Sequence, residues 1–149
     1  MKQAQTVRPV RAMHRGWAIT TACLTAGVLL LTLWPDSTVN SANFAPLREH
    51  GAAWSCLLRG CPASGASARF LVSDVIGNIA LFVPIGYAAA ATLTGRSRSR
   101  RFWMATLFGV LLSLLIETTQ LGIATRATDV DDLIFNSLGT VLGAILRRS

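Results

Sequence analysis

Carboxylate and amide side chains interrupt the apolar stretches of this 149-residue chain in three groups. The groups are Asp74 with Asn78, Glu117 with Gln120, and Arg126 with Asp129, Asp132 and Asn136. Spacings of three, four and seven place the acids and amides of each group on one face of a helix. Ionisable groups in apolar segments are costly and indicate a functional site, where carboxylates accept hydrogen bonds, bind cations or share protons. We therefore expect these side chains to line a ligand-binding site.

Four apolar stretches are long enough to position these groups in a membrane. The chain is 52% hydrophobic and only 14% charged, which is unlike a soluble domain. Because a helix needs roughly 20 apolar residues to cross a bilayer, the sequence predicts an all-α bundle of four transmembrane helices. They lie at about residues 17–34, 72–93, 102–123 and 129–146. The fourth helix spans only if its acids form the first turn. The first resembles a signal peptide but has a longer apolar run, so we expect it to be retained.

Basic residues cluster between the apolar stretches and give the expected orientation. Ten of the fourteen Lys and Arg residues lie in the two tails or in the 94–101 loop. Because such residues favour the cytoplasmic side, we expect both termini inside. The predicted segments are a basic cytoplasmic tail 1–16, a membrane domain 17–146 with an extracytoplasmic loop 35–71, and a cytoplasmic tail 147–149. The net charge of +7 is divided among these clusters, so we expect no nucleic-acid partner.

The outer loop contains two of the three cysteines and one of the two histidines. A short helix is expected around residues 46–58. Cys56 and Cys61 lie in an oxidising compartment, and the sequence leaves open whether they form a disulfide or two free thiols. Neither His14 nor His50 has companions at metal-ligand spacing, so we expect both at the surface.

With this topology, all three polar groups lie near the outer ends of their helices. The sequence therefore predicts convergence at one depth, with Asp131 off the helical stripe and solvated. A purely structural role, in which these groups bridge helices or complement helix dipoles, is the alternative.

We expect Pro84 and Gly86 to kink the second helix. Gly139 and Gly143 form a small-residue face for helix packing.

Three motifs in this order resemble the VanZ-like family of bacterial membrane proteins. They are Asp74-x-x-x-Asn78-x-x-x-Phe82-x-Pro84-x-Gly86, Glu117-x-x-Gln120, and Arg126-x-x-Asp129-x-Asp131-Asp132-x-x-x-Asn136-x-x-Gly139. The resemblance covers residues 17–146. It departs from the family at Ala127-Thr128, where members often carry apolar or aromatic residues, and in the long cysteine-containing loop. The resemblance implies a multi-pass protein of the bacterial cytoplasmic (inner) membrane. The family's namesake contributes to low-level teicoplanin resistance.

Our leading functional hypothesis is a cell-envelope accessory protein rather than an enzyme. Its outward acidic pocket would engage a cell-wall precursor, a lipid headgroup or a glycopeptide antibiotic, directly or through a divalent cation. Glu117, Asp129 and Asp132 would coordinate or accept hydrogen bonds, and Arg126 would hold a phosphate or balance the acids. The amides of Asn78, Gln120 and Asn136 would orient them.

Two other functions are compatible with the same residues. A membrane-embedded enzyme could use Glu117, Asp129 and Asp132 to hold Mg²⁺ or Mn²⁺ against a lipid-linked substrate. The chain offers no nucleophile–histidine pair and no glycine-rich phosphate loop to support it. A small cation-coupled transporter is the other alternative, but the inner halves of the helices lack the polar groups that would continue a path.

Overall fold

A computed structural model describes residues 8–34, 42–123, 125 and 128–147. Helices and the turns that connect them make up the described part, apart from two two-residue strands. In chain order the elements are α1 (Arg8–Leu33), β1 (Ala42–Asn43), α2 (Arg48–Arg59), α3 (Ser64–Leu71), a π-helical turn η1 (Val72–Ile76), α4 (Gly77–Thr92), α5 (Arg98–Gln120), β2 (Thr128–Asp129) and α6 (Val130–Leu146). The all-α prediction is confirmed at this level.

Three helical stretches are long and apolar enough to cross a membrane. They are Met13–Leu33, Ser64–Thr92 and Arg98–Gln120. The fourth predicted span corresponds to α6, whose 17 residues give a length of about 25 Å at 1.5 Å per residue. Four spans with both termini inside therefore remain a prediction.

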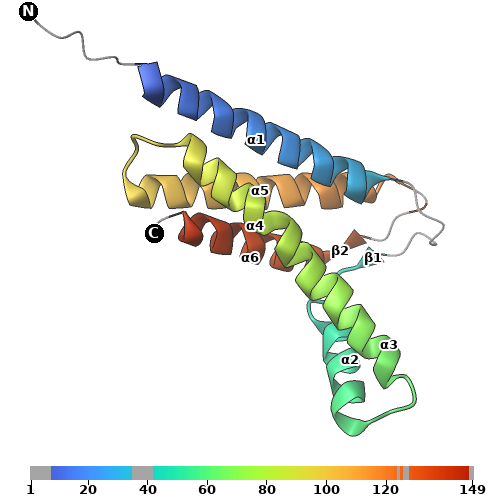
Figure 1. The fold of residues 1–149 in the computed structure, drawn as a ribbon. Coiled ribbons are helices and arrows are strands. Elements are labelled where there is room, and N and C mark those ends of the chain that lie inside the picture. The colour runs from blue at the N-terminus through green and yellow to red at the C-terminus, as the bar shows by residue number, and fades with distance from the viewer. Residues whose placement is uncertain (1–7, 35–41, 124, 126–127, 148–149) are drawn as a thin grey trace, which may run out of the picture.

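The second spanning stretch begins eight residues before the predicted start, because α3, η1 and α4 follow one another without a break. Its 29 residues exceed the roughly 20 that a bilayer requires. The excess carries α3 beyond the bundle. Figure 1 shows α2 and α3 projecting together from one end of it.

Glycines permit the closest helix contacts in the bundle. A Cβ added at Gly139 or Gly143 of α6 would overlap the backbone carbonyls of Ile79 or Val83 in α4. A Cβ at Gly86 of α4 would likewise overlap the Thr140 backbone. Side chains are therefore excluded at these contacts, which bring the α4 and α6 backbones together.

The core is small, and much of the remaining surface is apolar. Val28, Phe82, Ile85, Leu112 and Ile116 form the main buried cluster between α1, α4 and α5. Large aliphatic side chains on the outer faces of α1 and α5 stay exposed. Such a surface suits lipid rather than water as its surroundings.

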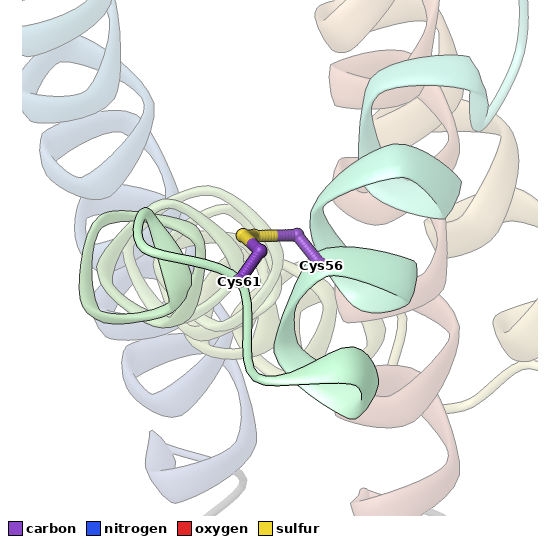
Figure 2. Close-up of a disulfide and its surroundings, with 2 residues drawn as sticks. All are labelled: Cys56 and Cys61. Carbon is purple, nitrogen blue, oxygen red and sulfur yellow. A yellow bond between two sulfur atoms is a disulfide. The ribbon is translucent and has the colours of Figure 1, made fainter.

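The ends of the bundle differ in what they carry. The start of α1, the α4–α5 connection and the end of α6 lie at one end, and β1 and β2 lie at the other (Figure 1). We call the end with the strands the strand end. Cys56 and Cys61 are joined by a disulfide across the turn that follows α2, with their Cα atoms 5.2 Å apart (Figure 2).

Candidate functional site

A short strand pairing fixes the start of α6 at the strand end. β1 and β2 are parallel, with Asn43 opposite Asp129. The Asn43 side-chain amide donates to both carboxylate oxygens of Asp129, at 3.1 and 3.2 Å. One of these oxygens also accepts from the backbone N–H of Asp131 at 2.9 Å, which caps α6. Asp129 therefore connects the segment that leads into α2 with α6, the helix that Asp129 caps.

His50 links two carboxylates that are far apart in the sequence. Its Nδ1 lies 2.8 Å from Oδ2 of Asp131, and its Nε2 lies 2.8 Å from Oδ2 of Asp74. Carboxylates only accept hydrogen bonds, so this geometry suits an imidazolium that donates from both nitrogens. The ring also contacts Phe70 and Phe135, each with a centroid separation of 5.0 Å. His50 thereby holds α2 against η1 and α6.

The surroundings of His50 favour its charged form. Burial lowers the pKa of the imidazole, but the hydrogen bonds and negative charges of Asp74 and Asp131 outweigh this effect. The pKa of His50 is consequently raised above its usual 6.5.

Two sequence predictions are wrong at this point. His50 is buried rather than at the surface, with 6% of the residue exposed, and Asp131 is fully buried rather than solvated. Asp131 is satisfied by the His50 ring and by the backbone N–H of Leu47 at 2.7 Å. The reason is that the first turn of α2 lies against the start of α6, and helical periodicity cannot predict this long-range contact. His14 is half-buried, with Nδ1 3.0 Å from the Thr92 carbonyl oxygen.

Asp74 reaches His50 from a π-helical turn. It lies within η1, which interrupts the α-helical pattern of the second spanning stretch. Such single-turn insertions occur frequently at functional sites. One turn further, Asn78 donates a hydrogen bond to Asp132 of α6. The predicted face thus reaches α6 in two ways: Asn78 contacts Asp132 directly, and Asp74 is connected to Asp131 through His50.

The α5 residues contribute a second set of contacts. Glu117 Oε2 accepts from the backbone N–H of Asp129 at 3.1 Å, and Glu117 also interacts electrostatically with Asp132. Gln120 turns toward α1, where its Nε2 donates to the Thr32 carbonyl at 2.9 Å.

Asn136 lies deeper, within the contact between α5 and α6. Its side-chain nitrogen donates to Ser113 Oγ at 3.0 Å, and both residues are buried. Asp74, Asn78, Glu117, Asp129 and Asp132 thus form the polar cluster of the strand end, with Gln120 and Asn136 at its margins. The remaining predicted site residue, Arg126, lies outside the described residues.

A cavity of about 170 Å³ adjoins this cluster between α5, α6 and the chain near β1. Glu117, Thr128 and Asp129 line it together with apolar side chains. Those apolar residues include Phe44, Leu114, Leu121 and Leu133. The cavity therefore has apolar walls beside buried acidic and hydroxyl groups, and it suits the apolar part of a ligand.

The described acids of the cluster are held mainly by hydrogen bonds within the protein. Within the part of the chain that the structure describes, no three His, Cys, Asp or Glu side chains converge to hold a metal ion. Glu117, Asp129 and Asp132, the candidate ligands, are instead engaged by a backbone N–H and by Asn43 and Asn78.

Comparison with known protein families identifies the family of the chain. The family model VanZ/LLP1 matches residues 17–148. The chain belongs to the VanZ/LLP1 family. The match includes every helix that contributes to the polar cluster, so the VanZ/LLP1 resemblance predicted from three short motifs is confirmed. Neither a comparison with curated proteins nor one with solved structures gives a match.

Sequence reasoning misses two side chains that organise this VanZ/LLP1 cluster. His50 has no companion at a recognisable spacing, because its partners lie 24 and 81 residues away. Asn43 precedes a Pro-containing turn and lies 86 residues from Asp129. The available signal is weak: a single histidine in the segment before the second predicted span, in a chain whose helix ends carry several acids.

Proposed function

We propose that this VanZ/LLP1 protein acts in the bacterial inner membrane as a cell-envelope accessory protein. Its strand end would face outward and bind an amphiphilic ligand of the envelope. Candidate ligands are a lipid headgroup, a lipid-linked cell-wall precursor and a glycopeptide antibiotic, all of which combine a polar group with an apolar portion.

The observation that carries this proposal is the cavity beside the polar cluster. Its walls are apolar and include Leu114, Leu121 and Leu133, and the buried oxygens of Glu117 and Thr128 belong to residues that border it. Leu114 and Leu121 are themselves exposed on the outer face of α5. A ligand in the bilayer could therefore place its apolar portion along α5 and its polar group against the cluster.

The charge distribution supports the outward orientation. The opposite end of the bundle carries the α4–α5 connection, with Arg96 and Arg98 beside it. Positive residues favour the cytoplasmic side, which would leave the acidic strand end outside. Envelope precursors and glycopeptides act on that side of the membrane.

The first test compares wild type with a Glu117→Gln/Asp132→Asn variant in a glycopeptide-sensitive host. The two proteins are produced at equal membrane levels, and teicoplanin and vancomycin susceptibility is measured. We expect wild type to protect and the double variant to lose protection. Glu49→Gln is the matched control, because Glu49 is an exposed carboxylate of α2 outside the cluster; it should protect like wild type.

Equal protection by wild type and the double variant would refute a functional role for the cluster. Protection by neither protein would refute the glycopeptide as the ligand, and lipid binding by the purified protein would then decide the proposal.

A further inference from the structure

Several buried oxygens around the polar cluster have no hydrogen-bond partner among the residues that the structure describes. They are Oε1 of Glu117, Oε1 of Gln120, Oγ1 of Thr128 and Oδ1 of Asn136. Each of these four residues is at most 6% exposed. A buried acceptor that has lost water and gained no donor is costly, so such oxygens in a native protein require an explanation.

All of these atoms accept hydrogen bonds. Glu117 Oε1 is a carboxylate oxygen, those of Gln120 and Asn136 are amide carbonyls, and only the Thr128 hydroxyl can also donate. The amide nitrogens of Gln120 and Asn136 are already used within the protein. A group that completes this set must therefore be a hydrogen-bond donor.

The charges at the strand end favour a positive donor. Both ion pairs found among the described residues use the same cation, His50, which already serves Asp74 and Asp131. The carboxylates of Glu117 and Asp132 repel each other, and neither has a cationic partner among the described residues. A cationic group at Glu117 would relieve that repulsion.

The shape of the site distinguishes an organic cation from a metal ion. A divalent ion requires several converging ligands, and no such group of side chains is found in the described parts of the chain. A primary ammonium brings its own three N–H donors and needs only acceptors within reach. Glu117 and Thr128 border the 170 Å³ cavity with their oxygens buried, and the apolar surface of the cavity accepts an apolar tail.

We propose that this site recognises the primary ammonium group of an amphiphile, with Glu117 as the counterion and the Thr128 hydroxyl as a second acceptor. The inference rests on the proposed function and specifies its ligand class. It excludes anionic and quaternary-ammonium headgroups as preferred ligands, since the former lack the positive charge and the latter lack N–H donors.

Native mass spectrometry of the full-length protein in detergent tests the inference directly. The probes are phosphatidylethanolamine, phosphatidylcholine and phosphatidylglycerol with identical acyl chains, titrated against wild type. We expect phosphatidylethanolamine to bind about tenfold more tightly than either of the others, the ratio expected for one charge-assisted hydrogen bond. Equal affinity for the primary and quaternary amines would overturn the inference.

Two variants locate the preference. Glu117→Gln should reduce the ratio of affinities to about one, because the charged acceptor is lost. Thr128→Val keeps the side-chain shape, removes the hydroxyl and should lower the ratio of affinities in part. This variant also provides the test of the site if Glu117→Gln fails to fold. Glu49→Gln, with its exposed carboxylate, should retain the full preference. A preference unchanged in both cluster variants would place the ammonium elsewhere and refute the site.

The same titration separates this inference from the proposed function. Cluster-dependent binding without a preference for the primary amine would leave an envelope-ligand protein but refute ammonium recognition. Lipid binding that no cluster variant alters would refute both. A competition experiment with free ethanolamine tests the contribution of the apolar tail. We expect free ethanolamine to compete only weakly with phosphatidylethanolamine. Equally strong competition would show that the tail contributes nothing to binding and would contradict recognition of an amphiphile.

Discussion

Removing the His50 side chain should be among the most destabilising single changes in this protein. In His50→Ala, the fully buried Asp131 loses the ring that lies 2.8 Å from its oxygen, and Asp74 loses a contact of equal length. A hydrogen bond to a charged group contributes about 1.5–3 kcal/mol, so the two together give about 3–6 kcal/mol. Mutational data on broken buried ion pairs give a similar loss of about 3–5 kcal/mol.

The natural control is the chain's other histidine. In His14→Ala, a half-buried ring loses one contact with the Thr92 carbonyl, at a cost of about 1 kcal/mol. Thermal unfolding of the detergent-solubilised protein measures the loss of stability in both variants. At about 2–4 °C per kcal/mol for a chain of this length, His50→Ala should melt roughly ten degrees lower and His14→Ala only a few degrees lower. Equal midpoints for the two variants would refute the buried ion-pair argument.

The same contact predicts how wild-type stability depends on pH. The pKa of His50 is raised in the folded state relative to 6.5 in the unfolded chain. Its contribution is therefore complete below about pH 6.5 and is lost as the pH rises through the folded value. The difference in midpoint between wild type and His50→Ala should shrink between about pH 6 and pH 9. A difference that grows over this range would contradict the sign of the shift.

Two further changes test the packing around the site. In Gly143→Ala, the added methyl group would overlap the Val83 carbonyl, which should cost about 1–3 kcal/mol of stability. In Gly27→Ala of α1, the added methyl group meets no atom within 4 Å and should stabilise the helix by up to about 1 kcal/mol. Shifts of the melting temperature with the same sign in both variants would refute the close α4–α6 contact. Replacing Cys56 and Cys61 together by serine opens a loop of sequence separation 5 and should cost about 2 kcal/mol. Melting with and without reductant measures that loss, and a loss as large as that of His50→Ala would show that the disulfide, not the histidine, holds α2 in place.

The convergence of the polar groups could be predicted because it depends on two regular properties. Helical periodicity places Glu117 and Gln120 on one face, and alternation of helix direction brings the ends of the second, third and fourth helices to the same end of the bundle. Neither property requires knowledge of side-chain contacts. The glycine contacts at Gly139 and Gly143 follow the same local logic, since small residues four apart on a helix leave room for a neighbouring backbone.

The contacts made by the segment that includes β1 and α2 could not be predicted in this way. β1 is only two residues long, and its register with β2 depends on the Asn43–Asp129 contact across 86 residues. α2 lies close to where a short helix is predicted, but its direction relative to the bundle has no local signal. The position of His50 follows from that direction. The π-helical turn that contains Asp74 likewise has no signal in the sequence.

The hydrogen bonds divide the acids of this site into two kinds. Asp131 accepts from the Leu47 backbone and from His50, and Asp129 accepts from Asn43 and the α6 backbone, so both are satisfied within the protein. Their removal should reduce stability, in agreement with a structural role. Glu117 differs, because one of its oxygens is buried without a described partner beside a cavity. A purely structural interpretation explains the first kind but leaves the Glu117 oxygen as an uncompensated cost, and a donor supplied by a ligand removes that cost.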